Sequence, residues 1–205
     1  MPDRTAPRNR RDEYARMTRQ DVIDAARKLF FEQGYEQTTV ADIARQAQVS
    51  PATVYAQLGG KEGLLQTLMD VWSTSPTVAR VVTDSIAQPT GPGILAVLAD
   101  GYIEHAAEAG DIMTVLELAS ASSTPAREFM DVGEQRHREA LQAVTQALSD
   151  IDALADGLSV ADAALIIYFH FRHPQLVLAS DTFGWGTERA RQWLLERVMA
   201  AILKS

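Results

Sequence analysis

The chain has 205 residues, no cysteine and a net charge of −8. The lack of cysteine excludes disulfides, thiolate metal sites and thiol nucleophiles. Hydrophobic residues make up 46% and charged residues 22% of the chain, which is typical of a globular protein. No apolar run approaches the roughly 20 residues that a membrane span requires, and no apolar segment follows the arginine-rich start. We therefore expect a cytoplasmic protein without a membrane partner.

The charge is divided unevenly along the chain. Residues 1–72 hold equal numbers of basic and acidic side chains, so the whole negative charge falls in residues 73–205. Residues 1–17 contain two prolines and are rich in arginine: Arg4, Arg8, Arg10, Arg11 and Arg16. We predict a flexible basic arm here, which could follow the phosphates of a nucleic acid or enter a minor groove. A solvated tail is the alternative.

The first predicted helix spans residues 18–33. Its apolar residues recur every three or four positions and would form one inner face: Val22, Ile23, Ala26, Leu29 and Phe30. Gly34 follows directly and is a typical helix-ending residue. These residues are expected to be core and are given no chemical role.

Residues 38–61 read TTVADIARQAQVSPATVYAQLGGK and predict two short helices joined by a tight turn. A threonine can cap the first helix and Ser50 the second, with Pro51 at the first helical position. Gly59-Gly60 ends the second helix. Two helices joined in this way form the helix-turn-helix pattern, whose second helix enters the DNA major groove. Residues 18–60 are therefore predicted to be a DNA-binding domain.

The rest of the chain is also predicted to be helical. Helical periodicity continues and no segment alternates with period two, so the predicted fold is all-α. One helix begins with KEGLLQTLMDVW at Lys61, and further helices are expected over residues 77–87, 94–109, 111–122, 125–149, about 160–180 and 187–203.

No pattern of residues points to catalysis or to a bound metal. No Ser/His/Asp spacing or pair of carboxylates stands out, and no segment has the context of a phosphate-binding loop. His170 and His173 are three residues apart but have no nearby cysteine or acid to complete a metal site. We expect no enzymatic activity, no cofactor and no metal.

Three stretches resemble a known family. They are AARKLFFEQGY at residues 25–35, TTVADIARQAQVSPATVY at 38–55 and KEGLL at 61–65. In this order and spacing they resemble the DNA-binding domain of the TetR family of bacterial transcription regulators. The resemblance implies an N-terminal three-helix helix-turn-helix domain and, over residues 61–205, a helical domain for ligand binding and dimerisation.

The resemblance also implies which residues contact DNA. The recognition helix corresponds to residues 51–57. Positions that match base contacts are Ser50, Pro51, Ala52 and Thr53, and those that match phosphate contacts are Thr39, Tyr55, Gln57 and Lys61. Ala41 matches a position that holds a base-reading arginine in some members of the family.

The recognition helix contains neither Arg nor Lys, so the commonest bidentate contact to guanine is absent. Pro51, Ala52 and the methyl group of Thr53 suit thymine methyl groups, whereas the hydroxyls of Ser50 and Thr53 can bond base edges. We expect modest base discrimination from this helix. Arg45, Gln46 and the arm are expected to supplement it.

Three residues depart from the family pattern. Gln48 stands where the turn usually has glycine, so it must adopt a left-handed conformation or bend the turn differently. Leu58 replaces an aromatic residue, which should thin the packing beneath the recognition helix. Gln57 replaces a common His or Tyr, so it keeps a donor to phosphate and loses stacking area.

A twofold dimer is expected, because one helix-turn-helix reads only a few base pairs. In the family the last two helices of each subunit form a four-helix dimer bundle, and here they correspond to about 160–180 and 187–203. Both segments are apolar over more than one face and must be buried by something. The interface candidates are Leu165, Ile166, Phe169, Leu176, Trp193, Leu194, Val198 and Ile202. The alternative is that they only fill the core of one subunit.

In the family the larger domain encloses an effector pocket. Such pockets are mostly apolar with a few polar groups, so the expected effector is a largely apolar small molecule. Candidate lining residues are Trp72, Tyr102, Met113, Leu116, Phe129, Met130 and Phe169, with Glu117, His105 or His170 as polar anchors. Ordinary core packing is the alternative for each of them. The segment Arg136-His137-Arg138 is expected to lie on a solvated helix face.

Together these features predict a homodimeric, ligand-responsive transcriptional repressor that binds double-stranded DNA at a palindromic operator. Binding of a small-molecule effector would favour a dimer whose recognition helices are spaced wrongly for successive major grooves. The alternative is a small-molecule-binding protein whose helix-turn-helix is vestigial.

Overall fold

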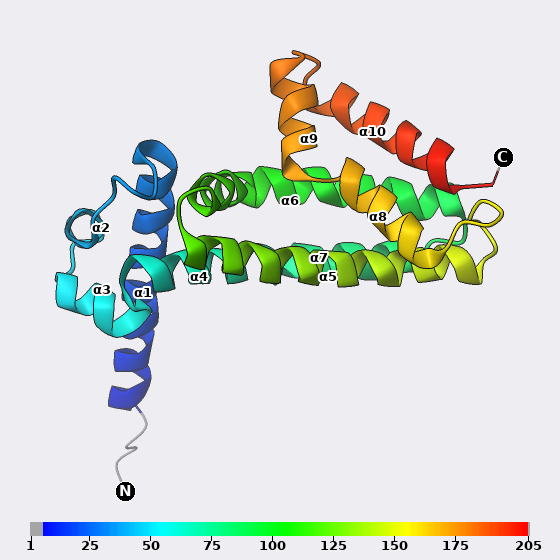
Figure 1. Ribbon diagram of the computed structural model, residues 1–205. Helices are drawn as coiled ribbons and strands as arrows, with labels where there is room; N and C mark the ends of the chain where they lie inside the picture. Colours follow the sequence, from blue (N-terminus) through cyan, green and yellow to red (C-terminus); the bar gives the residue numbers. More distant parts are fainter. Residues whose placement is uncertain (1–5, 205) are drawn as a thin grey trace, which may run out of the picture. The chain divides into compact units, whose positions relative to one another are not determined.

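The computed structural model describes residues 6–204, with side chains from Asp12 onward. This part of the chain is helical and contains no strand, which confirms the predicted all-α fold (Figure 1). None of its helices is long and apolar enough to cross a membrane. The helices are α1 Ala6–Gln33, α2 Val40–Gln46, α3 Pro51–Leu58, α4 Gly60–Ser73, α5 Pro76–Ile86, α6 Gly91–Ser120, α7 Thr124–Asp150, α8 Val160–His170, α9 His173–Val177, the π-helix η1 Leu178–Thr182 and α10 Thr187–Ile202.

Helix α1 begins at Ala6, twelve residues before the predicted start at Thr18. The prediction of a flexible arm is therefore wrong for residues 6–17, and residues 1–5 lie outside the described part. Residues 10–17 read RRDEYARM and consist mainly of good helix formers. Pro7 falls in the first turn, where its missing N–H has no helical partner to lose. Local propensity thus extends the helix beyond its apolar face.

The predicted turn chemistry of the helix-turn-helix is confirmed. Thr39 caps α2 in a capping box with Asp42, and Ser50 caps α3 by accepting a hydrogen bond from the amide of Thr53. Gln48 in the turn has a φ of +56°, so this residue adopts the left-handed conformation that glycine usually provides. Gly59 ends α3 in the same left-handed region.

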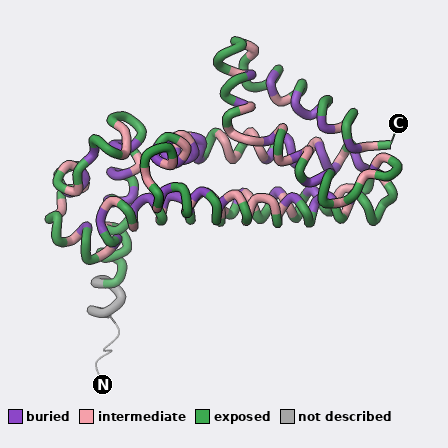
Figure 2. Tube along the Cα trace, viewed as in Figure 1, coloured by how far each residue is buried: buried purple, intermediate pink, exposed green. Residues whose placement is uncertain are grey.

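The chain divides into two compact units, and the division differs from the predicted boundary after residue 60. Unit 1 contains Met1–Val71 and Asp111–Met130, and unit 2 contains Trp72–Gly110 and Asp131–Ser205. Leu64, Leu65 and Leu68 of α4 are fully buried and belong to unit 1. Helices as short as α2 and α3 cannot bury enough surface alone, and α4 adds buried residues to unit 1 (Figure 2).

The two halves of α6 were predicted as separate helices, at 94–109 and 111–122. They are two helical segments that meet at a kink at Ala109, whose φ of −143° is not helical. The kink coincides with the boundary between the units, because Gly110 belongs to unit 2 and Asp111 to unit 1. The predicted interruption between the two helical segments is therefore confirmed.

The segment 160–180 is not one helix. Helix α8 ends at His170, Arg172 is extended with a ψ of 148°, and α9 restarts at His173. Pro174 has no N–H to donate to the carbonyl group four residues earlier and would clash with it. The chain therefore starts a new helix, with Pro174 in its first turn.

Candidate nucleic-acid interface and effector-binding residues

Helix α3 has a buried face and an exposed face. Val54 and Leu58, four residues apart, are buried. The predicted base-contacting residues lie at the start of the helix and are exposed or half-buried: Ser50, Pro51, Ala52 and Thr53. Leu58 is only 6% exposed, so it fills the position beneath α3 despite replacing a larger ring.

The two hydroxyl groups at the start of α3 are already engaged with each other. Oγ of Ser50 accepts from the amide nitrogen of Thr53 at 3.1 Å and lies 2.9 Å from the Thr53 hydroxyl oxygen. Capping thus uses part of the hydrogen-bonding capacity that was predicted for base edges. The methyl groups of Ala52 and Thr53 are then the side-chain groups best suited to thymine.

Tyr55 is 59% exposed, and its ring lies against Gly60, the first residue of α4. A Cβ atom at Gly60 would come within 2.8 Å of Cε1 of Tyr55. Gly60 also has a φ of +83°, which L side chains rarely adopt. Glycine at this position therefore leaves room for the ring that was predicted to contact phosphate.

Lys61 lies in the first turn of α4, where the helix dipole disfavours a cation. Its Nζ is 4.4 Å from the centre of the Tyr35 ring and donates to the carbonyl oxygen of Glu36 at 3.4 Å. Tyr35 packs edge-on against the buried Phe30, with ring centres 5.1 Å apart. A cation–π contact and a carbonyl group thus offset the unfavourable helix position.

Thr39, Arg45 and Gln46 are exposed on α2 or at its cap. Thr39 donates from its hydroxyl to Asp42 at 2.6 Å, and Arg45 forms an ion pair with the same carboxylate. The hydrogen bonds from Thr39, followed by those from Arg45, lower the pKa of Asp42. A contact between Arg45 and DNA would therefore compete with Asp42.

None of the ten residues predicted to contact DNA is buried, and all ten belong to unit 1. Gln57 is half-buried, and its Oε1 is buried without a hydrogen-bond partner. Contact with DNA stays a prediction for each of these residues.

The residues predicted to line an effector pocket are divided between the two units. Met113, Leu116 and Met130 are buried in unit 1. Phe129 and Glu117 of the same unit are half-buried. Trp72, Tyr102, His105, Phe169 and His170 belong to unit 2.

Within unit 2, Trp72 and His105 are in ring contact, with centres 5.6 Å apart. Tyr102 packs on Phe171 at 5.2 Å and donates from its hydroxyl to the carbonyl oxygen of Arg172. Phe169 is 62% exposed, and its ring lies against that of the neighbouring His170. A position in an enclosed pocket is therefore wrong for Phe169 in the single chain.

The expectation that Arg136-His137-Arg138 lies on a solvated helix face is also wrong. All three residues are half-buried. Nη1 of Arg136 donates to Oγ of Ser73 at 2.8 Å. The His137 ring lies 6.1 Å from that of Trp72 and 5.5 Å from that of Tyr168. The sequence signal that could have found this contact is the spacing of His137 from Leu141 and Val144, which are buried on the same side of α7.

Half of the predicted dimer-interface residues fill the core of unit 2. Leu194, Val198 and Ile202 form the stripe of α10 that is buried with residues of α6, α7 and α8, and Leu176 packs in a smaller cluster beside it. These four predictions are wrong for the isolated chain. Apolar residues at helical spacing can face the core of their own subunit as well as a dimer partner, and the spacing does not distinguish the two. Ile166 is half-buried. The large apolar residues of this region that stay exposed include Leu165, Phe169, Leu178, Phe183 and Trp193.

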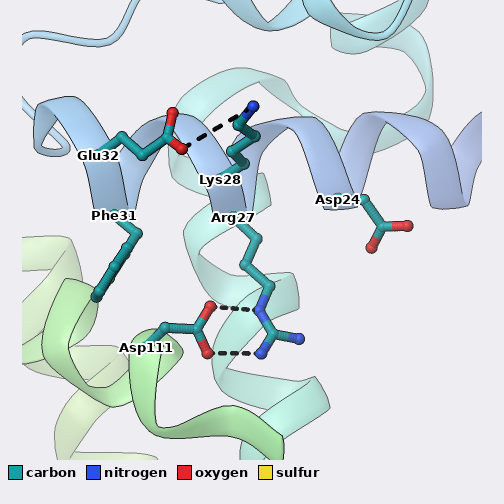
Figure 3. Close-up of a pocket in the computed structure, with 6 residues that line it drawn as sticks. All are labelled: Asp24, Arg27, Lys28, Phe31, Glu32 and Asp111. Carbon is teal, nitrogen blue, oxygen red and sulfur yellow. Dashed lines mark hydrogen bonds and ion pairs between the residues drawn. The ribbon is translucent and has the colours of Figure 1, made fainter.

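A shallow groove of about 260 Å³ lies on unit 1 between α1 and the second half of α6 (Figure 3). Nε and Nη2 of Arg27 donate to the two carboxylate oxygens of Asp111 at 2.6 and 2.5 Å. Lys28, Glu32 and the exposed Phe31 line the same groove. The mixture of charges gives it no preference for ions of one sign. In the described residues no group of three His, Asp or Glu side chains could hold a metal ion.

Comparison with known proteins finds a family match in the amino-terminal part of the chain. Residues 22–68 match the family model of bacterial regulatory proteins, tetR family. The regulator HbdR of Aromatoleum sp. is 47% identical over 57 residues, which are 27% of this chain and 25% of that protein. The regulator TtgR of Pseudomonas putida is 39% identical over 61 residues, which are 30% of this chain and 29% of that protein. The matches thus cover less than a third of these two relatives.

Solved structures extend the likeness in fold to most of the chain. SmeT in complex with triclosan has a TM-score of 0.77 and 20% identity, and the match covers 92% of this chain and 93% of SmeT. FadR from Bacillus subtilis in complex with stearoyl-CoA has a TM-score of 0.75 and 20% identity. This match covers 89% of this chain and 98% of FadR. Residues 22–68 therefore match the tetR family in sequence, and the rest of the chain shares the fold of these structures.

The TetR family match has a clear limit within the chain. It begins at Val22 on the inner face of α1 and ends at Leu68 in α4. From α5 onward the likeness is one of fold, at about 20% identity. The residues of unit 2 must therefore be interpreted from their own chemistry.

Proposed function

We propose that this protein is a DNA-binding transcriptional repressor that acts as a homodimer on a palindromic operator and is released by a small-molecule effector. The main observation in support of the proposal is the exposed face of α3. Its inner residues are buried, its first turn presents small side chains at the surface, and it lies in the region that matches the tetR family model. A capped, exposed second helix is what major-groove docking requires.

The exposed groups on unit 1 fall into two classes that suit different parts of a duplex. Tyr55 and Lys61 supply a ring and a cation for the phosphate backbone, which provides affinity without sequence information. Pro51, Ala52 and Thr53 supply methyl and methylene groups that suit thymine methyls. No arginine or lysine lies within α3. We therefore infer an operator recognised through thymine-containing steps rather than through guanine.

The homodimer is inferred from the exposed apolar residues of unit 2. Leu165 and Phe169 lie four residues apart on α8, so they share one face, and Trp193 is exposed on α10. Water contact with such large side chains is unfavourable, and a second copy would cover them. A twofold pair would also place two recognition helices on two half-sites.

Release by an effector is supported by the named complexes of two neighbours in fold. SmeT is described with triclosan and FadR with stearoyl-CoA, both small molecules with large apolar parts. In the proposed mechanism the effector binds better to a dimer whose recognition helices do not match successive major grooves. The population of DNA-competent dimers then falls.

A gel-shift titration tests the proposal. The duplex that flanks the protein's own gene is compared with an unrelated duplex of equal length and composition, at several salt concentrations. We expect preferential, salt-dependent binding to the flanking duplex. Lys61→Ala should weaken binding and reduce the slope of log K against log salt by about 1 per subunit. The matched control is Lys204→Ala, which removes a lysine of unit 2.

Equal and salt-insensitive binding to both duplexes would contradict the proposal. It would instead favour a small-molecule-binding protein with a vestigial helix-turn-helix.

A further inference from the structure

The first turns of α1 extend beyond the buried core of unit 1. Among residues 12–21 only Thr18 is half-buried and the others are exposed, whereas burial begins at Val22. Figure 1 shows that this end of the helix reaches past α3, and Figure 2 shows its exposure. These exposed side chains are available to a partner.

Two arginines in this exposed part continue the buried face of α1. Ile23, Ala26 and Phe30 are buried and recur at intervals of three and four residues. Arg19 and Arg16 extend the same series toward the N-terminus, so they lie on the same face of the helix. We call these two residues the arginine stripe. The face of α1 thus changes from apolar to cationic where the helix leaves the core.

The arginine stripe lies on the side of α1 that holds the proposed recognition helix. Within unit 1, α1 packs against α2 and α3 through its buried face. A stripe that continues this face points to the same side. A duplex that takes α3 into its major groove presents its phosphate backbone at the edges of that groove. The two arginines are therefore on the side of α1 where phosphates would lie.

Neither arginine is held by an acidic side chain among the described residues. Nε of Arg16 donates to a backbone carbonyl oxygen, that of Asp12, at 3.4 Å. Arg19 makes no hydrogen bond or ion pair with a described residue. By contrast, Arg27 and Arg45 of the same unit each form an ion pair with a carboxylate. An arginine without such a partner gives up no ion pair when it binds a phosphate, and its planar guanidinium matches phosphate oxygens in pairs.

The surroundings of the arginine stripe favour nucleic acid as its partner. Residues 1–19 contain six arginines and three acidic residues, so this end of the chain is cationic. It directly precedes residues 22–68, which match the tetR family model. Charge complementarity and this position both point to the duplex that α3 is proposed to read.

We propose that the arginine stripe binds backbone phosphates of the duplex beside the major groove that α3 enters, and that α1 is helical through Arg16 when it does so. A rigid helix then sets the position of both guanidinium groups, which lowers the entropy lost on binding relative to a flexible arm. The inference rests on the proposed function, because it adds a contact to the same duplex.

Anisotropy titrations of the full-length protein with the flanking and the unrelated duplex test the proposal. We expect Arg16→Ala and Arg19→Ala each to weaken binding several-fold and to reduce the slope of log K against log salt by about 1 per subunit. Because phosphates carry no sequence information, both duplexes should lose affinity by the same factor. Lys28→Ala is the matched control on the opposite face of α1 and should bind as the wild type does.

Unchanged affinity and salt dependence in either arginine variant would overturn the proposal. A loss confined to the flanking duplex would also overturn it, because the arginines would then read bases rather than phosphates.

A gain of affinity provides a test that misfolding cannot imitate. Asp12 lies four residues before Arg16 on the face of the arginine stripe, where its carboxylate would repel a phosphate. We expect Asp12→Asn to tighten binding to both duplexes several-fold at low salt. Asp21→Asn removes the same charge from the opposite face of α1 and should have a smaller effect. Equal gains from the two variants, or none from Asp12→Asn, would show that the stripe does not face phosphates.

The helical form of this segment is tested with proline. Met17 is 58% exposed, so replacing it leaves the core intact. Met17→Pro removes a helical hydrogen bond and disfavours helix at Arg16, whereas Met17→Ala does neither. We expect Met17→Pro to lose helical signal in circular dichroism at an unchanged melting temperature, and to bind duplexes as weakly as Arg16→Ala. Binding equal to that of Met17→Ala would show that a flexible arm suffices and would overturn the proposal.

The same titrations separate this inference from the proposed function. If the wild type prefers the flanking duplex and the arginine variants bind as it does, the repressor stands and the arginine stripe is rejected. If the arginine variants bind more weakly but the wild type prefers neither duplex, the stripe stands and the repressor is rejected. Binding of neither duplex by the wild type rejects both.

Discussion

The ammonium group of Lys61 lies 4.4 Å from the centre of the Tyr35 ring. This contact joins the first turn of α4 to the corner after α1. The backbone carbonyl of Glu36 also accepts a hydrogen bond from Lys61, and the Glu36 carboxylate accepts one from Ser122 at 3.1 Å. Lys61 is therefore held in place before any phosphate arrives. Restricting a lysine side chain in this way lowers the entropy that it would lose on binding.

Replacing Tyr35 should weaken duplex binding through Lys61. We expect Tyr35→Leu to reduce affinity for the flanking duplex several-fold, because the cation–π contact contributes roughly 0.5–2 kcal/mol. The loss should shrink in a Lys61→Ala background, which a double-mutant cycle measures. Tyr35→Phe, which keeps the ring, is the control and should bind as the wild type does. Equal losses in the two backgrounds would show that Tyr35 does not act through Lys61.

The left-handed Gln48 should be a site where glycine stabilises the protein. A side chain in this left-handed region destabilises the folded protein by about 1–2 kcal/mol, and glycine would remove that strain. Glycine also loses more conformational entropy on folding, which offsets about 0.5–1 kcal/mol of the gain. We expect Gln48→Gly to raise the melting temperature by about 1–4 °C, as measured by calorimetry. Gln46→Gly, at the right-handed end of α2, should lower it instead. A lower melting temperature for Gln48→Gly would contradict this account of the turn.

The helix-turn-helix could be predicted closely because its determinants are local. The hydroxyl of Ser50, the ring of Pro51 and the two glycines at 59 and 60 each constrain only the backbone beside them. One local prediction was wrong. The prolines and arginines before residue 18 suggested a flexible arm, yet helix α1 begins at Ala6 because helix propensity decides the structure there. Apolar periodicity indicates which part of a helix packs against a core. It does not indicate how far the helix extends beyond that part.

The stability of the protein should fall as the pH falls below about 6.5. Burial lowers the pKa of His137 to about 4 in the folded chain. Between these two pH values the unfolded chain binds a proton that the folded chain does not, so stability rises with pH across this window. One such group contributes at most about 1.4 kcal/mol per pH unit.

His137→Gln should flatten this pH dependence, as measured by thermal unfolding between pH 4.5 and 7.5. The comparison is one of slopes, so a uniform loss of stability in the variant does not affect it. His170→Gln is the control for loss of an imidazole. Identical slopes for the wild type and His137→Gln would show that His137 stays solvated.

A charge on the exposed face of α8 should break the proposed dimer. We expect Phe169→Asp to convert the protein to monomers at micromolar concentration in sedimentation velocity, because a buried unpaired carboxylate is strongly unfavourable in an interface. Phe31→Asp places the same charge on an exposed phenylalanine of unit 1 and should leave the dimer intact. A Phe169→Asp dimer as stable as that of the wild type would remove α8 from the interface.

The positions of the effector-site and interface candidates in unit 2 could be predicted only in part. Trp72 and His105 were named together from their residue types, and their rings are in contact. The charged neighbours of His137 in the sequence suggest a solvated helix face, yet Arg136, His137 and Arg138 are all half-buried and Arg136 donates to Oγ of Ser73. The stripe of α10 could not be assigned from sequence either. Leu194 and Val198 meet the same spacing rule whether they face their own core or a partner.

The central claim is that α3 reads bases through apolar contacts in the major groove. It is tested most directly by the affinity of the wild-type protein for the flanking duplex with thymine and with uracil, which differ only in the base methyl group that α3 is proposed to contact. We expect preferential binding to the thymine duplex, weakened several-fold by uracil, with most of that difference lost in Ala52→Gly. Equal affinity for the two duplexes would contradict the account.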